Sequence, residues 1–267
     1  MGYRRKMGRY FLILLLSLFL WGCSENSVKE KGVRRIGTLS SAAAVVLTRM
    51  GMPPAAVDEY CRSVVEARTP VVGKGTALST ERLLALKINT LVVWNYQKNA
   101  LEHLSRYGIE VVGVEPLRAG NYATLVRDME KLTGKSEEAK KIIADHEEIF
   151  RGLKNFSGKE KRVYFELYSR NRGAGDESYI GDLLRAAGGK SILKKSALAG
   201  SEYIVTQNPQ VIFFVEGMGS AEEIMNRNGF STLDAVKNKA VFPVPRALLV
   251  EGAFPLEAVT FFRKRMD

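Results

Sequence analysis

The chain contains an internal repeat that sets its architecture. The segment TERLLALKINTLVVW (Thr80 to Trp94) aligns without gaps on SEYIVTQNPQVIFFV (Ser201 to Val215), at a constant offset of 121 residues. Each copy consists of a hydroxyl residue, a glutamate, a short amphipathic segment and an apolar run typical of a buried strand. Internal similarity of this kind indicates that one structural unit is used twice. The repeat therefore predicts two lobes of related design.

Strand-like and helix-like segments alternate in both halves of the chain. In the first half, the expected strands are 35–39, 91–95 and 109–114, and the expected helices are 42–50 and 97–107. In the second half, the expected strands are 162–168, 211–215 and 241–244, with a helix at 179–187. Such alternation favours α/β layering. We expect an α/β fold of two Rossmann-like lobes with central, mainly parallel sheets.

One long segment without strand character joins the two halves. In KSEEAKKIIADHEEIFRGLKNF, Ser136 is a suitable N-cap, and the two glutamates after it suit the positive end of a helix dipole. A helix from Ser136 to Asn155 would be about 30 Å long. One stiff helix predicts limited closure of the lobes. The expected organisation is an N-terminal lobe at 33–135, a linker helix at 136–156 and a C-terminal lobe at 157–267.

The N-terminal region predicts export and a lipid anchor. An apolar run from Phe11 to Trp21 follows a basic stretch. Because a membrane-spanning helix needs about 20 apolar residues, this run is interpreted as a secretory signal. Leu20 to Cys23 (LWGC) resembles the lipobox of bacterial lipoproteins, in which the signal is cut before a cysteine that is then lipidated. The alternative is an ordinary signal with a coincidental cysteine. We expect a signal peptide at 1–22, lipidation of Cys23 and a flexible tether at 23–32, with the protein facing the periplasm or the cell exterior.

Composition argues against several classes of function. The net charge is +11, but Lys and Arg are spread along the chain, so an anionic ligand or anionic lipids are more plausible partners than nucleic acid. The two histidines are too few for a three-histidine metal site. If Cys23 is lipidated, Cys61 is alone and no internal disulfide can form. No Gly-x-Ser-x-Gly or HExxH motif occurs, which disfavours an exported hydrolase.

Several segments together resemble the helical-backbone substrate-binding proteins of ABC importers. They include RRIGTLSSAAAVVLTRMGM, DEYCRSVV, VVGKGTALSTERLLALKINTLVVW, LTGKSEEAKKI, SYIGDLLRAAGGKSI and LDAVKNKAVFPVP. Members of this family take up cobalamin, ferric siderophores, haem and some metals or oxyanions. The resemblance implies a monomer that captures a small metal chelate and delivers it to an ABC permease with its ATPase. It also implies no catalysis, no resident metal and no cofactor.

The resemblance implies a role for one glutamate in each copy of the repeat. In members that bind vitamin B12, a glutamate on each lobe docks onto arginines of the permease. The matching positions are Glu81 in STERLLALK and Glu202 in SEYIVTQNP. Two carboxylates on matching surfaces would form a two-point electrostatic contact. The alternative is that each glutamate only complements the dipole of its own helix.

Candidate ligand contacts follow the carboxyl ends of the expected strands, where α/β sheets bind ligands. They are Ser40, Ser41, Tyr60, Lys74, Trp94, Tyr96, Arg170, Arg172, Met218 and Arg246. Arg170 and Arg172 lie in the loop 169–178, and guanidinium groups suit carboxylates, catecholates or phosphates. The alternative for these two arginines is a solvated surface loop. For Trp94 and Tyr96 it is packing at a strand end.

The arginines favour an anionic iron chelate as the ligand, either a ferric siderophore or haem. Cobalamin is the alternative within the same family, although the aromatic floor expected for a corrin ring is thin and the first strand leads into Ser40-Ser41-Ala42 without the proline common in relatives. A sensory or interaction lipoprotein of the same fold is the alternative outside transport. Ligand choice depends on loop shape rather than on a motif, so these possibilities stay open.

Overall fold

The first sheet is built from parallel strands in the order β2-β1-β5-β6. The computed structural model describes residues 34–153 and 160–267, so the expected signal peptide, Cys23 and the tether lie outside the described residues. The strands are β1 (Ile36–Thr38), β2 (Ala56–Val57), β5 (Thr90–Trp94) and β6 (Glu110–Val114). Val92 of β5 lies opposite Thr38 of β1 and Val112 of β6. All of β5 is buried, as its unbroken apolar run predicts.

Helices and a short hairpin surround this sheet. They are α2 (Ser41–Arg49), α3 (Thr80–Ala85), α4 (Asn95–Leu101), α5 (Tyr122–Thr133), the 3-10 helices η1 (Glu59–Val64), η2 (Glu102–Tyr107) and η3 (Ala119–Asn121), and the strands β3 (Gly73–Lys74) and β4 (Ala77–Leu78). The helix expected at 97–107 is divided between α4 and η2, and it ends at Gly108 in the left-handed conformation. The amphipathic helix α5 was not among the expected segments.

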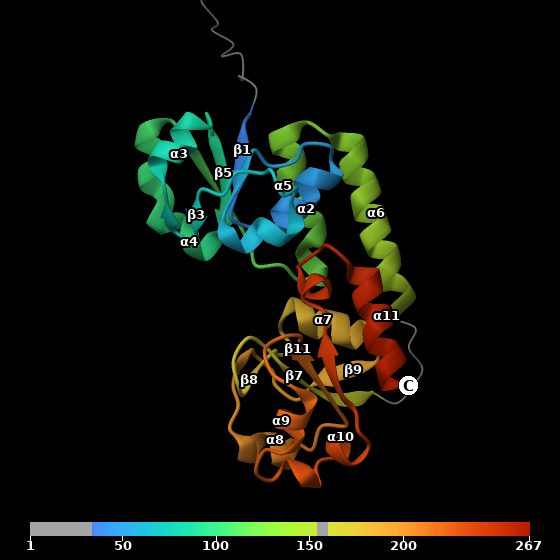
Figure 1. Ribbon diagram of the computed structural model, residues 1–267. Helices are drawn as coiled ribbons and strands as arrows, with labels where there is room; N and C mark the ends of the chain where they lie inside the picture. Colours follow the sequence, from blue (N-terminus) through green and yellow to red (C-terminus); the bar gives the residue numbers. More distant parts are fainter. Residues whose placement is uncertain (1–33, 154–159) are drawn as a thin grey trace, which may run out of the picture. The chain divides into compact units, whose positions relative to one another are not determined.

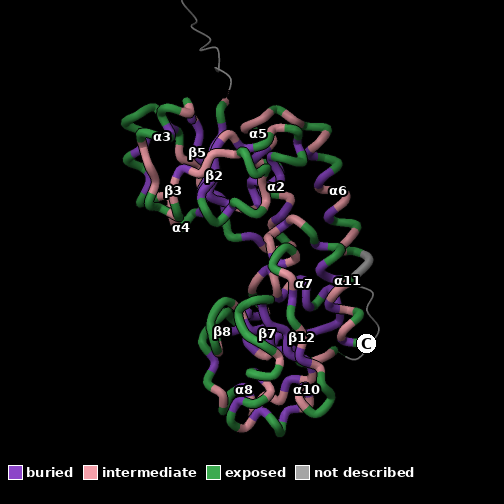
Figure 2. Tube along the Cα trace, viewed as in Figure 1, coloured by how far each residue is buried: buried purple, intermediate pink, exposed green. Residues whose placement is uncertain are grey.

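The second sheet has the order β10-β8-β7-β11-β12, with β9 also paired to β7. Its strands are β7 (Lys161–Glu166), β8 (Arg172–Gly173), β9 (Gly189–Ser191), β10 (Ala197–Leu198), β11 (Val211–Val215) and β12 (Val241–Val244). The pairs that β7 makes with β9 and β11, and the pair of β11 with β12, are parallel, whereas β8 runs antiparallel to β7 and β10. In Figure 2 the labelled strands β5 and β7 are mainly buried, whereas β12 is buried only at Val241 and Val244.

The helices of this half are α7 (Tyr179–Ala186), α8 (Ser201–Gln207), α9 (Ala221–Met225), α10 (Asp234–Lys237) and α11 (Pro255–Met266), with the 3-10 helices η4 (Phe230–Thr232) and η5 (Arg246–Leu249). Phe262 of α11 packs against Phe165 of β7 and Phe213 of β11, with ring centroids 6.1 and 4.9 Å apart. The C-terminal helix therefore covers the second sheet with aromatic side chains.

The two copies of the repeat adopt the same local structure. The helix α3 and the strand β5 correspond to α8 and β11, and β11 has the bounds expected from the sequence. The residues that end the two helices also match, because Lys87 (φ 55°) and Asn208 (φ 42°) both adopt the left-handed conformation. The α/β fold with mainly parallel sheets is confirmed.

The helix α6 (Ser136–Leu153) connects the two halves, as the sequence predicts for this segment. It packs against α2, α5 and α11 (Figure 1). Ala139 and Ile142 of α6 belong to a cluster of buried apolar side chains that also contains Val92 of the first sheet and Phe213 of the second. Residues 34–267 form one compact unit. The lobe boundaries at 33–135 and 157–267 stay a prediction. No helix within the described residues has the length and apolar character needed to cross a membrane.

Candidate functional site

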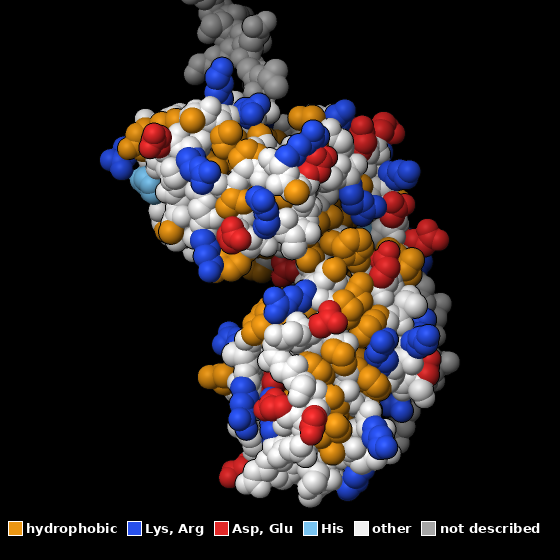
Figure 3. Space-filling model, in the orientation of Figure 1, with side chains coloured by type: hydrophobic (Ala, Val, Ile, Leu, Met, Phe, Trp, Pro, Cys, Tyr) orange, Lys and Arg blue, Asp and Glu red, His pale blue; other side chains and the backbone are white. Residues whose placement is uncertain are grey.

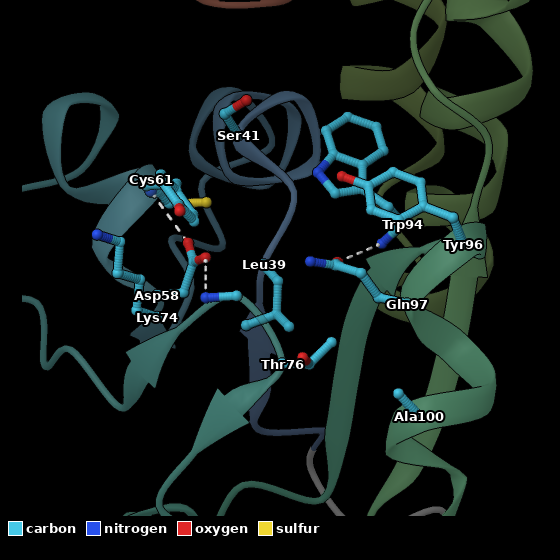
Figure 4. Close-up of a pocket in the computed structure, with 12 residues that line it drawn as sticks. Leu39, Ser41, Asp58, Cys61, Lys74, Thr76, Trp94, Tyr96, Gln97 and Ala100 are labelled. Carbon is cyan, nitrogen blue, oxygen red and sulfur yellow. Dashed lines mark hydrogen bonds between the residues drawn. The ribbon is translucent and has the colours of Figure 1, made fainter.

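A pocket of about 810 Å³ opens at the carboxyl ends of the parallel strands β1, β2 and β5 (Figure 4). It is lined by Leu39, Ser41, Asp58, Tyr60, Cys61, Lys74, Gly75, Thr76, Trp94, Tyr96, Gln97 and Ala100. Leu39 follows β1, Asp58 follows β2 and Trp94 ends β5. Since these strands are parallel, their ends meet at one edge of the sheet, where α/β proteins bind ligands.

One wall of the pocket is aromatic. Trp94 is largely buried, with 9% of its surface exposed, whereas Tyr96 in the first turn of α4 is 73% exposed. The Gln97 side-chain oxygen accepts a hydrogen bond from the backbone N–H of Trp94 at 3.2 Å, which fixes the junction between β5 and α4. Figure 4 shows Trp94 and Tyr96 together on the side of the pocket opposite Asp58 and Lys74. The wall offers aromatic surface for stacking against a planar or apolar group.

The opposite wall combines a phenol with a cation. Tyr60 is 66% exposed, and the Lys74 ammonium lies 5.5 Å from the centroid of its ring. This is within the range of a cation–π interaction. Neither the Tyr60 hydroxyl nor the Lys74 ammonium forms a hydrogen bond or an ion pair with another described residue. Both groups are therefore available to an anionic or hydrogen-bonding ligand.

The buried carboxylate of Asp58 links the two segments that form this wall. Asp58 is fully buried and caps η1, and its carboxylate accepts the backbone N–H of Cys61 and of Gly75, each at 3.1 Å. Burial raises the pKa of Asp58, and the hydrogen bonds from Cys61 and Gly75 offset part of that effect. Because Gly75 follows Lys74 in the β3-β4 hairpin, the carboxylate joins the segment of Tyr60 to that of Lys74. Asp58 was not among the expected pocket residues, although an aspartate just before EYC is a typical N-cap signal.

The expected ligand residues fall into two groups. Ser41, Tyr60, Lys74, Trp94 and Tyr96 come together around the pocket. Ser40 is fully buried, and its hydroxyl accepts the N–H of Ala43 as the N-cap of α2. Arg170, Arg172, Met218 and Arg246 are exposed and are not among the residues that line this pocket.

The expected arginine contacts of the second half lie on different elements: Arg170 and Arg172 at β8, and Arg246 on η5 beside the end of β11. Arg172 belongs to β8, a short strand inside the segment expected to be a loop at 169–178. Arg170 precedes this strand, and its charge acts on Glu223. The Arg246 guanidinium donates to the Glu216 carbonyl at 3.0 Å and lies 3.1 Å from the Met218 sulfur. Arg246 is thus oriented by the end of β11 rather than by another charged side chain.

The two glutamates of the repeat occupy matching places. Glu81 lies in the first turn of α3 and Glu202 in the first turn of α8, and both are exposed. Within residues 34–153 and 160–267, neither carboxylate takes part in a salt bridge. Both carboxylates are therefore accessible for ion pairs with cationic side chains of another protein.

Other chemistry is limited in the described part of the chain. It holds no cluster of three or more His, Cys, Asp or Glu side chains suited to a metal ion. Cys61 is a free, buried cysteine, and burial raises the pKa of its thiol, which disfavours the reactive thiolate. The face drawn in Figure 3 mixes basic and acidic side chains and shows no continuous basic strip of the kind that binds nucleic acid.

Comparisons with known proteins point to one family. A model described as "Periplasmic binding protein" matches residues 36–248. No curated protein matches the chain. A structure described as a possible iron-binding (periplasmic solute-binding) protein from Staphylococcus epidermidis is 22% identical over 87% of this chain and 98% of its own, with a TM-score of 0.71.

Two structures from Vibrio cholerae have the same fold. The periplasmic haem-binding protein HutB is 20% identical, over 87% of this chain and 98% of its own, with a TM-score of 0.76. The periplasmic vitamin B12-binding protein BtuF is 20% identical, over 87% of this chain and 96% of its own, with a TM-score of 0.71. At these identities the likeness establishes the fold.

Proposed function

The chain belongs to the periplasmic binding protein family, whose members bind substrates rather than catalyse reactions, and from this premise we propose that it captures an iron chelate and delivers it to an ABC permease. The chelate is a ferric siderophore or haem. Family membership implies an extracytoplasmic location. Removal of residues 1–22 and lipidation of Cys23 complete the proposal, because they would hold the receptor beside its permease in the membrane.

The pocket at the strand ends carries this proposal. Its aromatic wall of Trp94 and Tyr96 lies opposite Tyr60 and Lys74, and its volume of about 810 Å³ suits an organic chelate rather than a bare ion. The Lys74 ammonium supplies a positive charge for an anionic oxygen, and the aromatic rings supply stacking surface. These features together suit an anionic chelate with flat or apolar parts.

The similar structures indicate which chelates to compare. One is described as possibly iron-binding, HutB as haem-binding and BtuF as vitamin B12-binding. Cobalamin is therefore the alternative ligand. Arg170, Arg172 and Arg246 lie on the half of the chain that would close over a ligand in a two-lobed receptor, so we keep them as proposed contacts.

A titration tests the proposal directly. The chain contains two tryptophans, so a Trp21→Phe form of the full chain in detergent reports on Trp94 alone. Haemin, ferric tris-catecholate, ferric trihydroxamate, cobalamin and molybdate are added in turn. We expect an iron chelate to quench the emission saturably, and Tyr60→Ala to weaken its binding about tenfold, or about 1.4 kcal/mol.

The matched control for this titration is Tyr107→Ala, because Tyr107 is also exposed but lies on η2 outside the pocket. It should bind like the unmodified chain. Preference for cobalamin over every iron chelate would select the alternative ligand. If no ligand of the panel quenches the Trp94 emission or gives a binding signal in calorimetry, the sensory or interaction lipoprotein is favoured.

Delivery to the permease is tested by the paired glutamates. We expect the double variant Glu81→Ala/Glu202→Ala to bind the chelate normally but to lower uptake by cells at least about tenfold, because both electrostatic contacts with the permease are lost. The control is Glu102→Ala/Glu222→Ala, which removes two other exposed first-turn glutamates. Equal uptake by the two double variants would contradict the docking role.

A further inference from the structure

Gln97 is a pocket residue whose side-chain amide has a fixed orientation. It lies in the first turn of α4, lines the pocket and is half-buried. Its Oε1 atom accepts the backbone N–H of Trp94 at 3.2 Å. Because a backbone N–H group can only donate, the oxygen of the amide, and not the nitrogen, must face Trp94. The hydrogen bond therefore turns the Nε2 atom of Gln97 away from the backbone of Trp94.

The N–H donors of this Nε2 atom are directed into the pocket. Figure 4 shows the nitrogen pointing away from Trp94, toward the side of the pocket that holds Asp58 and Lys74. Within residues 34–153 and 160–267, Nε2 donates to no other residue, and the atom is not buried. A donor that is already held in place and has no protein partner can pair with a ligand at little cost in side-chain ordering.

The electrostatics of the pocket suit an acceptor atom on the ligand. Asp58 and Lys74 are the charged side chains among the lining residues. Asp58 is fully buried, and its two carboxylate oxygens accept the backbone N–H groups of Cys61 and Gly75, each at 3.1 Å. The Lys74 ammonium has no hydrogen bond or ion pair with another described residue. The two side-chain nitrogens left unpaired, those of Lys74 and Gln97, can only donate, so the ligand must supply acceptors.

We propose that Gln97 is a ligand contact, donating a hydrogen bond from Nε2 to an anionic oxygen of the bound chelate. Hydrogen bonds to charged oxygens are stronger than those between neutral groups. Because the Gln97 oxygen is already used by Trp94, the amide selects a catecholate or carboxylate oxygen at this place and rejects a ligand group that can only donate. This inference rests on the proposed function, since it assigns a contact to the chelate in the proposed pocket.

The substitution Gln97→Glu tests the inference, because it changes a single group. Glutamate keeps an oxygen for the Trp94 N–H but replaces the donating nitrogen by an oxygen that shares a negative charge. Haemin and a ferric tris-catecholate are titrated calorimetrically into the full chain in detergent at about pH 7.5, where the new carboxylate is ionised. We expect the affinity for the chelate that the unmodified chain binds to fall at least about thirtyfold. The melting temperature should not fall, because the bond to Trp94 is kept.

The matched control is Gln210→Glu. The Oε1 atom of Gln210 accepts the backbone N–H of Arg162 at 3.1 Å, so its amide makes the same kind of bond as that of Gln97. Gln210 is also half-buried, but it is not among the residues that line the pocket. This variant adds the same negative charge and should bind the chelate like the unmodified chain.

The outcomes separate this inference from the proposed function. If a chelate binds Gln97→Glu as tightly as the unmodified chain, the inference is overturned and the proposed function stands. If Gln97→Glu lowers the melting temperature together with the affinity, the amide nitrogen supports the fold rather than the ligand, and the inference is again overturned. An equal loss of affinity in Gln210→Glu would trace the effect to net charge and would overturn it too. If no iron chelate binds any form, the proposed function fails and the inference falls with it.

Discussion

Replacing Arg227 by methionine should lower the free energy of unfolding by about 3–5 kcal/mol. The Arg227 side chain is 3% exposed and donates to both carboxylate oxygens of Glu166, at 2.6 and 2.8 Å, while the Glu166 side chain is 6% exposed. Burial works to lower the pKa of Arg227, but hydrogen bonds to Glu166 and Glu223 outweigh it and raise that pKa. The substitution would leave a buried carboxylate without its cation, which explains the large expected loss. Urea unfolding followed by circular dichroism measures it.

The size of this loss depends on burial rather than on the presence of an Arg–Glu pair. Arg227 also pairs with Glu223 four residues earlier, and Arg151 pairs with Glu147 at the same spacing but with its side chain 76% exposed. Arg151→Met is therefore the matched control, and it should change the free energy of unfolding by less than about 0.5 kcal/mol. An equal effect of the two substitutions would show that burial of the pair contributes nothing.

A second variant separates the unpaired charge from lost packing. Glu166 also accepts the Tyr164 hydroxyl at 3.2 Å and the backbone N–H of Asn171 at 2.9 Å. Glutamine at position 166 can still accept these bonds but carries no charge. Adding Glu166→Gln to Arg227→Met should therefore recover a large part of the lost stability. If it recovers none, the loss comes from packing around the guanidinium. Since Asn171 precedes β8, the same network fixes the start of the segment that carries Arg172.

Local patterns predict the elements of this chain well where the pattern is continuous. The apolar run at 211–215 set the bounds of β11 because an unbroken apolar run between Gln210 and Glu216 defines a buried strand. The bounds of β12 also agree with the strand expected at 241–244, although only Val241 and Val244 of this strand are buried. The expected helix at 97–107 changes to a 3-10 helix at Glu102, and no local signal marks that point. The strand β8 is two residues long and is stabilised by pairing with β7 and β10, so it has no signature of its own.

Contacts between distant residues are the part that the sequence does not predict. Glu166 and Arg227 are 61 residues apart, and neither belongs to a motif. Asp58 meets Gly75 only because the β3-β4 hairpin folds back over η1. Strand-end reasoning could nominate Tyr60, Lys74, Trp94 and Tyr96, because it needs only the topology of a parallel sheet.

The unmodified chain should lose stability on acidification because of His146. The imidazole is 5% exposed and stacks on Tyr122, with ring centroids 3.9 Å apart, while Phe150 lies 4.6 Å away on α6. Its buried Nε2 atom has no hydrogen-bond partner. Burial, helped by the charge of Arg49, lowers the pKa of His146 from 6.5 to about 4. The folded protein therefore keeps this histidine neutral under conditions that protonate it in the unfolded chain.

The sign and size of the effect follow from linkage. Below pH 6.5 the unfolded chain binds a proton that the folded chain does not, so the free energy of unfolding falls by about 1.4 kcal/mol per pH unit until about pH 4, or about 3 kcal/mol in all. His146→Phe keeps an aromatic ring in the stack but cannot be protonated. Urea unfolding of both proteins between about pH 7.5 and about pH 4.5 should show the unmodified chain losing about 2–3 kcal/mol relative to the variant.

Carboxyl groups also titrate in this range, so the informative quantity is the difference between the two pH profiles. His103, the other histidine of the chain, is exposed, and His103→Phe should follow the profile of the unmodified protein. Parallel profiles for His146→Phe and the unmodified protein would mean that the imidazole accepts a proton without leaving the stack. In that case water must reach Nε2 in the folded state, and α6 would be less tightly packed against Tyr122 than its ring geometry indicates.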